Sequence, residues 1–305
     1  MAKVIVIGAG PAGIMAAIHA SKKHNVILLD GNDRIGKKLF ITGKGRCNVT
    51  NAKDISEFFD YIPGNPHFLY SALYTFSNYS LLEYLSNNGL EYKVELDEKV
   101  YTKSDKADEV IELLRNDLEK NKVKIRYNTM ISDLIVEDGI IKGVITSYGE
   151  KILGDKVIIT TGGKSFPNTG SDGAMYEVLE KHGHTITPIH AALIPLVIKE
   201  DFVKKLQGVA MKDVVVSARL KKKKFEKFGD MLFTHFGISG PAVLKLSSYI
   251  SKALSENEVE VTLDFLRDKS KDEISQIIRS NPNKTVLNNL KGVLPQNFLK
   301  VVFEM

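Results

Sequence analysis

The chain has 305 residues, 43% of them hydrophobic and 26% charged, which indicates an ordinary globular protein of about two domains at roughly 150 residues each. Its net charge of +5, from 42 basic and 37 acidic residues, is far below the dense positive charge of a dedicated nucleic-acid binder. The single cysteine, Cys47, excludes an intrachain disulfide and fits a reducing compartment.

The same sequence predicts a protein of the cytoplasm. No apolar run approaches the roughly 18 residues that a membrane span needs, so no membrane partner is expected. The first predicted strand begins at about Lys3, which leaves no room for a signal peptide.

The chain opens with a predicted strand, helix and strand. Residues 4–7 are a β-branched run, typical of a strand buried on both faces. The glycine-rich turn 8–13 follows, and residues 14–23, rich in Ala, Met and Ile, predict a helix. Residues 26–30 predict a second buried strand that ends at Asp30. Together they form a βαβ unit of about thirty residues.

The next segment, residues 31–51, is polar, contains four glycines and predicts irregular structure. A segment of this length without a regular element is usually functional or disordered. Helical patterns follow at 66–88 and, more clearly, at 107–121. The second of these has one apolar face, made by Val110, Ile111, Leu113, Leu114 and Leu118.

Strands dominate the pattern after this helix. Residues 123–127 predict one strand, and three alternating runs at 131–136, 140–147 and 151–153 predict a β-meander. Residues 156–161 predict another buried strand, which ends in Thr160-Thr161-Gly162-Gly163.

From about residue 191 the pattern changes, and we predict a second domain there. Residues 214–220 alternate like an exposed strand, residues 221–224 are four lysines at a predicted hairpin tip, and residues 259–265 predict a further strand. Helical patterns run from about residue 270 to the end. The predicted domains are 1–190 and 191–305.

The turn after the first strand satisfies the pattern GxGxxG with Gly8, Gly10 and Gly13. The first glycine allows a tight turn, the second lets the backbone approach a pyrophosphate, and the third lets the helix pack closely on the strand. Asp30, at the end of the next strand, is placed to accept hydrogen bonds from a ribose and disfavours a 2′-phosphate. This context predicts a dinucleotide site; an ordinary βα turn with a solvated aspartate is the alternative.

The polar, glycine-rich stretch 34–51 favours FAD over NAD as the dinucleotide. An NAD domain passes from its second strand into a helix, whereas a loop here can wrap the longer FAD molecule. Its glycines permit close backbone approach and its Lys and Arg residues match phosphate charge. A flexible surface loop is the alternative. The turn Thr161-Gly162-Gly163 is predicted to lie against the cofactor, or to be a plain strand-to-loop turn.

Four stretches resemble the BaiN/YhiN-type FAD-dependent oxidoreductases, often labelled aminoacetone-oxidase-like flavoproteins. The first joins Gly36-Lys37-Lys38-Leu39 to the run from Thr42 to Asn51 and is highly specific. The others are Val100 to Ala107, Thr161 to Pro167 with Gly170-Ser171-Asp172-Gly173, and Leu232 to Pro241. Together the stretches span nearly the whole chain.

The resemblance implies an α/β fold, a Rossmann-like two-dinucleotide-binding FAD domain with a β-meander, interrupted by an inserted small β-barrel and helical domain from about residue 191. It also implies that FAD is the cofactor, with the adenine near the backbone of Met130 and Ile131. The residues expected to contact FAD are Gly8, Ala9, Gly10, Pro11, Ala12, Gly13, Asp30, Gly31, Lys37, Lys38, Leu39, Thr42, Gly43, Gly45, Arg46, Cys47, Asn48, Met130, Ile131, Thr161, Gly162 and Gly163.

One departure from the family pattern concerns the C-terminal part. Family members return from the insert to the FAD domain and end with a glycine-rich segment that holds a Gly-Glu or Gly-Asp beside the flavin. After Gly240 this sequence has a single glycine, Gly292. We therefore expect a truncated or split form that lacks this segment, with an activity of its own in question.

Two residues are candidates for catalysis. His235 lies in a Thr-His-Phe-Gly-Ile-Ser-Gly-Pro turn and is a candidate general acid or base, with a structural turn as the alternative. Cys47 is a candidate redox thiol, with a small packing residue as the alternative. His182, His184 and His190 lack metal-ligand spacing backed by Asp, Glu or Cys, so no metal site is predicted.

The leading hypothesis is an FAD-dependent oxidoreductase that transfers a hydride through the bound flavin to or from a small-molecule substrate, with NAD(P)H as a candidate electron donor. A flavin-dependent RNA-modifying enzyme is the second hypothesis, because the chain is mildly basic and the lysines at 221–224 can meet RNA or anionic lipid. A solvated hairpin tip is the favoured interpretation of these lysines, because no aromatic residues are interleaved among them. An inactive FAD-binding remnant is the third. No paired carboxylates, nucleophile triad or second GxGxxG selects a substrate or one nicotinamide cofactor, and the oligomeric state stays open.

Overall fold

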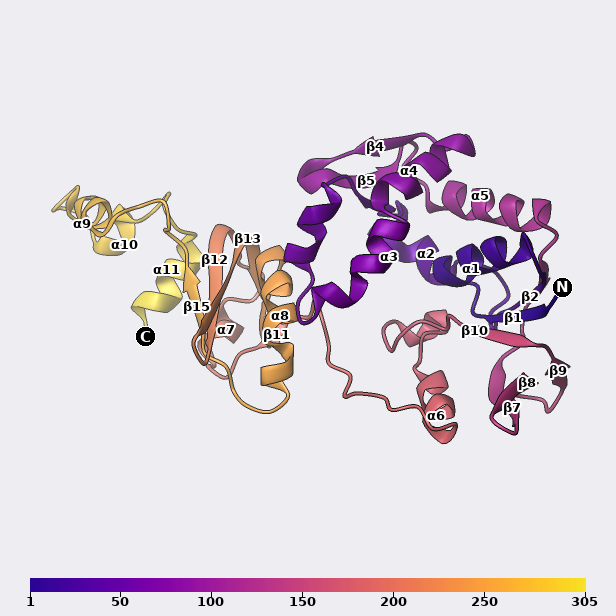
Figure 1. Ribbon diagram of the computed structural model, residues 1–305. Helices are drawn as coiled ribbons and strands as arrows, with labels where there is room; N and C mark the ends of the chain where they lie inside the picture. The colour runs from indigo at the N-terminus through magenta and orange to yellow at the C-terminus, as the bar shows by residue number, and fades with distance from the viewer. The chain divides into compact units, whose positions relative to one another are not determined.

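The computed structural model describes all 305 residues and divides them into two compact units, Met1–Thr187 and Pro188–Met305. The strands of each unit pair only within that unit (Figure 1), and the apolar clusters of the two units share no residue. That the second unit is an insert within a longer FAD domain stays a prediction. No helix in either unit combines the length and apolarity needed to cross a membrane.

The first unit is built on a four-stranded parallel sheet with the order β10-β1-β2-β6. Its strands are β1 (Lys3–Ile7), β2 (Asn25–Leu29), β6 (Lys124–Arg126) and β10 (Lys156–Ile159). Strand β1 therefore lies between two parallel neighbours, which explains its unbroken β-branched sequence. The predicted βαβ start and the parallel sheet are confirmed.

Successive residues of β1 serve two different cores. Val4 and Val6 face α1 (Pro11–Ser21) and α5 (Ala107–Lys120), whose apolar faces pack on one side of the sheet. Ile5 and Ile7 face the other side, where β7 (Ile131–Glu137), β8 (Ile140–Thr146) and β9 (Lys151–Leu153) form an antiparallel meander. This alternation follows from the two-residue period of a strand. Helix α6 (Ala174–Lys181) joins the second core through Met175.

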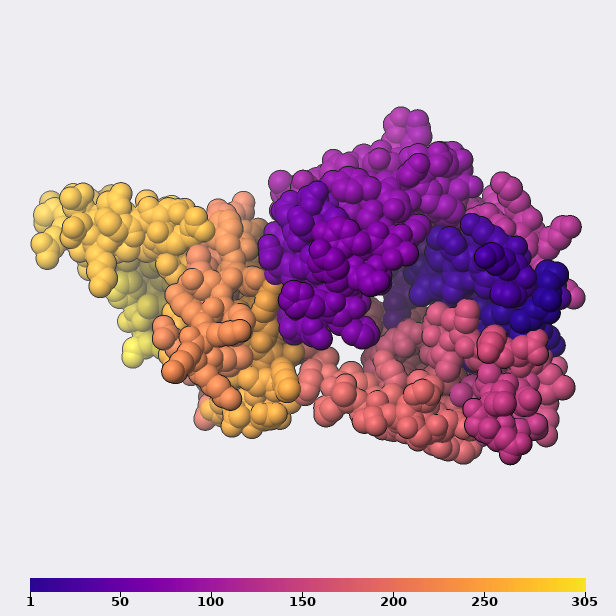
Figure 2. Space-filling view, viewed as in Figure 1, coloured from indigo at the N-terminus to yellow at the C-terminus, as the bar shows by residue number.

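Between β2 and α5 the chain forms a lobe that shares the core under α1 and α5, and Figure 2 shows it in violet on the surface of the first unit. The segment predicted to be irregular at 31–51 contains α2 (Lys37–Ile41), the 3₁₀ turn η1 (Thr42–Gly45) and the short β3 (Thr50–Asn51), so that prediction was wrong for these residues. Strand β3 pairs with β5 (Lys99–Thr102), which also pairs with β4 (Tyr92–Val94). Pairing across some fifty residues could not be read from a local pattern.

The rest of this lobe is helical. The predicted helix at 66–88 is divided into η3 (Pro66–Leu69), α3 (Tyr70–Thr75) and α4 (Asn78–Asn87). Helix α4 begins at Ser77, whose side chain accepts a hydrogen bond from the Ser80 backbone and so caps a new helix. The short turns η2 (Ile55–Tyr61) and η4 (Leu96–Glu98) complete the lobe.

The second unit is a five-stranded sheet with the order β11-β14-β13-β12-β15. Its strands are β11 (Leu196–Val197), β12 (Ala210–Leu220), β13 (Lys223–Phe233), β14 (Gly237–Ser239) and β15 (Val261–Asp264). The inserted β-barrel implied by the resemblance corresponds to this sheet, whose two outer strands, β11 and β15, are not paired with each other. The β12–β13 hairpin turns at Lys221 and Lys222, within the predicted tip, whereas Lys223 and Lys224 already belong to β13.

Helices cover this sheet and continue to the end of the chain. Helix α8 (Pro241–Leu254) packs on β12 and β13, where Val214, Val216 and Ala218 are buried. The prediction of an exposed strand at 214–220 was therefore wrong, because β12 lies between β13 and β15 and one of its faces supplies the core. The remaining helices are α7 (Phe202–Lys205), α9 (Lys271–Arg279), α10 (Val286–Asn289) and α11 (Gln296–Phe303).

Candidate functional site

The glycine turn between β1 and α1 is packed so closely that two of its glycines have no room for a side chain. A Cβ on Gly13 would lie 1.9 Å from the Gly8 carbonyl oxygen and 2.5 Å from Thr160 Oγ1. Gly8 has φ +97°, and a Cβ there would lie 2.6 Å from the Thr160 carbonyl oxygen. The first and third glycines thus bring α1 against β1 and the end of β10.

Gly10 differs from its neighbours because the space beside it is open. A Cβ on Gly10 would meet no atom within 4 Å, and the residue lines a cavity. It is the N-cap of α1, has no side chain to cap the helix, and is followed by Pro11 in the first turn. The free N–H groups and partial positive charge of this helix end therefore face the cavity, which suits a phosphate.

The cavity has a volume of about 370 Å³ and lies at the carboxyl ends of β1, β2 and β10. Thirteen of the residues predicted to contact FAD line it: Gly8, Ala9, Gly10, Pro11, Ala12, Asp30, Gly31, Lys37, Lys38, Met130, Ile131, Thr161 and Gly162. The fold brings these residues together from segments more than a hundred positions apart. Their contacts with FAD stay predictions.

The wall of the cavity also contains residues that the sequence analysis did not single out as ligands. They are Ile7, Asn32, Thr129, Thr160, Thr169, Gly170, Ser171, Asp172, Ala174 and Met175. The stretch from Gly170 to Gly173 belongs to the resemblance, and that signal could have identified it as part of the site. Asn32 has no such signal, because its place depends on contacts with a distant loop.

Asp30 lies at the end of β2 and is only 8% exposed. Its Oδ2 accepts a hydrogen bond from the Ala9 backbone at 2.5 Å, and its Oδ1 accepts from the Asn32 backbone at 2.7 Å and from Asn32 Nδ2 at 2.8 Å. These bonds hold the carboxylate against the glycine turn. Because a carboxylate has about four acceptor positions, it can still accept from a ribose hydroxyl.

Asn32 and two lysines of the cavity wall make polar contacts with neighbouring segments. Asn32 Nδ2 also donates to the Thr169 carbonyl at 3.2 Å, and Lys37 Nζ donates to Asn32 Oδ1 at 2.9 Å. Lys38 Nζ donates to the Ser165 carbonyl at 2.6 Å. The bond from Asn32 to Thr169 joins two segments of the wall, and the two lysines contribute positive charge to the same cavity that the start of α1 lines.

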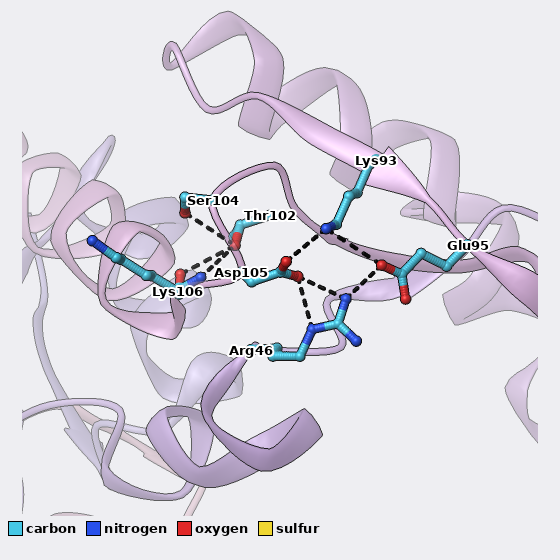
Figure 3. A network of polar contacts seen from close by, with 7 residues as sticks. All are labelled: Arg46, Lys93, Glu95, Thr102, Ser104, Asp105 and Lys106. Carbon is cyan, nitrogen blue, oxygen red and sulfur yellow. Dashed lines mark hydrogen bonds and ion pairs between the residues drawn. The ribbon is translucent and has the colours of Figure 1, made fainter.

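The remaining predicted ligands lie outside the cavity wall: Gly13, Leu39, Thr42, Gly43, Gly45, Arg46, Cys47, Asn48 and Gly163. Gly13 contributes packing, as described above. Thr42 to Asn48 form a separate loop, in which the Arg46 guanidinium points toward Glu95 and Asp105 (Figure 3). The fold does not bring this loop into the wall of the cavity.

The two candidate catalytic residues occupy different settings. Cys47 is fully buried, and burial raises the pKa of its thiol, although a hydrogen bond with Thr42 offsets part of that effect. A protonated thiol is a poor redox nucleophile, so this setting favours the packing alternative. His235 is exposed in the second unit, where its ring packs edge-on against Phe236 at 4.8 Å between centroids.

A larger cavity, of about 1000 Å³, lies in the second unit. It is lined by parts of β11, α7 and the segment from Leu254 to Leu263, with Phe233 and Ile238 beneath. None of the predicted site residues lines it, and it has no glycine turn or helix N-terminus comparable to that at Gly10. Size alone therefore does not identify the functional site.

The family of the chain follows from a comparison of sequences. The family model described as the HI0933-like protein Rossmann domain matches residues 2–261. The chain belongs to the HI0933-like family. Its members are FAD-binding oxidoreductases, so the resemblance seen in the sequence, the prediction of a flavoenzyme and the prediction of FAD as cofactor are confirmed.

Two curated relatives match nearly the whole chain. A 3-dehydro-bile acid delta(4,6)-reductase of Clostridium scindens is 34% identical over 100% of this chain and 75% of its own length. A ribosomal RNA dihydrouridine synthase of Haemophilus influenzae is 30% identical over 98% of this chain and 73% of its own. Among solved structures, the open conformation of a flavocytochrome c3 fumarate reductase is similar in fold, with a TM-score of 0.51 and 18% identity over 69% of this chain and 47% of that one.

Proposed function

We propose that this HI0933-like protein reduces a ring carbon–carbon double bond that is conjugated to a carbonyl group, with FAD as the hydride carrier. The observation that carries the proposal is the cavity at the N-terminus of α1, which has open space at Gly10 and a carboxylate, Asp30, held against the glycine turn. A dinucleotide needs both features, one for its pyrophosphate and one for its ribose.

The choice of bond comes from the names of the relatives. The Clostridium scindens relative is named as a reductase of a 3-dehydro bile acid at positions 4 and 6, which is a ring ketone with ring double bonds. The Haemophilus influenzae relative is named as a dihydrouridine synthase, and dihydrouridine is uridine with one ring double bond saturated beside a carbonyl. A conjugated carbonyl makes the distant carbon of such a bond a good hydride acceptor, so one flavin site can serve both substrates.

Each part of the cavity has a proposed role in holding FAD. The free N–H groups at the start of α1, with Lys37 and Lys38, would hold the pyrophosphate, and Asp30 would accept from the ribose. The backbone at Met130 and Ile131 would face the adenine. Bound FAD supplies a two-electron carrier, and NAD(P)H is the proposed source of the hydride. His235, in the second unit, stays a candidate general acid or base on the sequence pattern alone.

A second candidate function is reduction of uridine in RNA. It is favoured by the name of the Haemophilus influenzae relative and by the basic tip of the β12–β13 hairpin, where Arg219, Lys224 and Lys227 lie near the lysines at 221–223. Two of these side chains are already engaged, because Lys224 pairs with Glu226 at 2.6 Å and Lys227 lies over the Tyr249 ring at 4.1 Å. We therefore rank a small conjugated ketone first as the substrate. We also propose that the protein acts in the cytoplasm.

Two measurements test the proposal in order. The chain is mixed with FAD, passed through a gel-filtration column and scanned for the absorbance of oxidised flavin, which we expect to be retained. The flavin is then reduced with NADH or NADPH without oxygen, and its reoxidation is followed after addition of a steroid dienone or of a uridine-containing RNA. Reoxidation by the dienone supports the first candidate and reoxidation by RNA the second. Reoxidation by neither, with flavin retained, contradicts both substrate classes.

A further inference from the structure

The loop from Thr42 to Asn48 has an unusual backbone. Gly43, Lys44, Gly45 and Cys47 all have left-handed φ angles, of +58°, +60°, +87° and +57°. Glycine adopts such angles freely, but Lys and Cys do so at a cost and persist there only when the surrounding structure holds them. The Cys47 backbone N–H donates to the Thr42 carbonyl at 3.0 Å, which closes the loop on itself. Further restraints must come from outside the loop.

The side chain of Arg46 provides such a restraint. Its Nε donates to Asp105 Oδ1 at 2.7 Å and its Nη2 to Glu95 Oε1 at 2.5 Å, as Figure 3 shows. The guanidinium also lies over the Tyr101 ring, 4.0 Å from the centroid. Lys93 Nζ donates to Asp105 Oδ2 at 2.7 Å and lies 3.3 Å from Glu95. Two cations and two carboxylates thus alternate in one cluster, and every member of it outside Arg46 comes from the β4–β5 region.

Asp105 is the better fixed of the two carboxylates. It has φ +61° in the turn that follows β5, and its backbone N–H donates to the Thr102 carbonyl at 3.1 Å. The Thr102 hydroxyl is fully buried and accepts from the Lys106 backbone at 2.9 Å, which closes the turn. Each oxygen of Asp105 therefore meets a different cation from a rigid position. Glu95 reaches the same cations with a longer side chain.

We propose that Asp105 is a positioning residue that holds Arg46 on Tyr101 and so fixes the strained loop from Thr42 to Asn48 for its contact with FAD. Two stretches that carry the family resemblance, Thr42 to Asn51 and Val100 to Ala107, thereby act as one unit. The contact of this loop with FAD is the one predicted from the family resemblance, because the loop lies outside the cavity wall, and for that contact the inference rests on the proposed binding of FAD. The restraint of the loop is a property of this chain alone.

The test compares Asp105→Asn with Glu112→Gln in the full chain. The first variant removes the charge that meets Arg46 and Lys93; the second removes a charge that pairs only with Arg115 on the surface of α5, at 2.5 Å. Trypsin cleavage after Lys44 is measured by mass spectrometry relative to cleavage after Lys23 in the same digest, and FAD affinity is measured by fluorescence titration. Because the cluster is about one third exposed, we expect a threefold to roughly tenfold change, not a complete loss.

The expected result is faster cleavage after Lys44 and weaker FAD binding in Asp105→Asn, with Glu112→Gln like the natural chain. Arg46→Lys keeps the charge but loses the forked geometry, so it should show the same two changes. In the double variant Asp105→Asn with Arg46→Lys, the change in cleavage and in FAD affinity should equal that of the more affected single variant, because both substitutions act through one contact. Unchanged cleavage in Asp105→Asn, or additive effects in the double variant, would overturn the proposal. If the natural chain fails to bind FAD, the proposed function fails while the cleavage comparison still decides this inference.

Discussion

Two segments of the first unit are predicted to contact FAD, and they are stabilised in opposite ways. The glycine turn at 8–13 is held by its immediate neighbours in the sheet: the Gly8 N–H donates to the Leu29 carbonyl at 2.7 Å, and Thr160 Oγ1 donates to the Ile7 carbonyl at 2.7 Å. The loop at 42–48 is held by Arg46, whose partners lie 49 and 59 positions along the chain. Backbone contacts and absent side chains shape the first segment, and partly buried charges shape the second.

This difference has a consequence for tolerance to change. In the glycine turn, an added methyl group clashes with closely packed backbone, so a substitution there should cause a large steric loss of stability. In the loop, water and the remaining charged contacts can replace one that is lost. A substitution there should therefore cause a smaller, electrostatic change in how firmly the loop is held. Substitutions in the two segments should therefore differ in the size of their effect on stability.

The largest effect should come from Gly13→Ala. The new Cβ would lie 1.9 Å from the Gly8 carbonyl oxygen, so α1 must move away from β1. We expect a loss of about 3 kcal/mol or more in unfolding free energy, or a fall of roughly 6–12 °C in Tm. Thermal unfolding followed by circular dichroism measures it. A Tm within 2 °C of the natural chain would show that the turn is less rigid than described.

Gly10→Ala should separate binding from stability. Gly10 has φ −76° and ψ 175°, which alanine adopts easily, and a Cβ there meets no protein atom within 4 Å. The methyl group would instead occupy the cavity where the pyrophosphate is proposed to lie. We expect FAD affinity to fall roughly tenfold or more while the unfolding free energy changes by less than about 1 kcal/mol. Equal FAD affinity in the two chains would move the pyrophosphate away from this turn.

The same contrast decides what the sequence alone could predict. The order of strand, glycine turn, helix and strand depends on spacings of a few residues, so the meeting of Gly8, Gly10 and Asp30 at one cavity was predictable. The hydrogen bond from Asn32 to the Thr169 carbonyl spans 137 positions, and no local sequence pattern predicts it.

The loop shows the second limit of sequence reasoning. Arg46 was expected to serve the cofactor because a cation suits a phosphate, yet its guanidinium is engaged by Glu95 and Asp105. Only the pairing of β3 with β5 brings these carboxylates to it, and that pairing is non-local. A charged residue can be recognised from sequence, but its partner depends on the fold.

Acid should loosen the loop and leave the sheet unchanged. Hydrogen bonds from Lys93 and then Arg46 lower the pKa of Asp105, and a hydrogen bond from Arg46 lowers the pKa of Glu95. Both folded pKa values lie below the ordinary values of 3.8 and 4.5, so the stabilisation is complete above those values and is lost as the pH falls below them. Arg46 and Lys93 stay charged throughout.

The measurement is hydrogen exchange between pH 6 and pH 3, corrected for the intrinsic rates. We expect protection of the amides at 42–48 to fall several-fold below about pH 4.5 while the amides of β1 keep theirs. Asp105→Asn should reduce this pH dependence and leave the part that is due to Glu95. An equal loss of protection in β1 would indicate general acid unfolding and contradict a local effect.

The smallest effect should come from Cys47→Ala. The thiol is fully buried and burial raises its pKa, so it is a poor redox nucleophile and we expect it to act as a packing residue. Removal of the sulfur should cost about 1 kcal/mol in unfolding free energy through lost packing and change flavin turnover by less than about threefold. Turnover is followed as NAD(P)H oxidation with a conjugated ketone, and stability as thermal unfolding. A loss of turnover of a hundredfold or more at unchanged flavin content would restore Cys47 as a redox residue, and would mean that the loop supplies chemistry as well as contact.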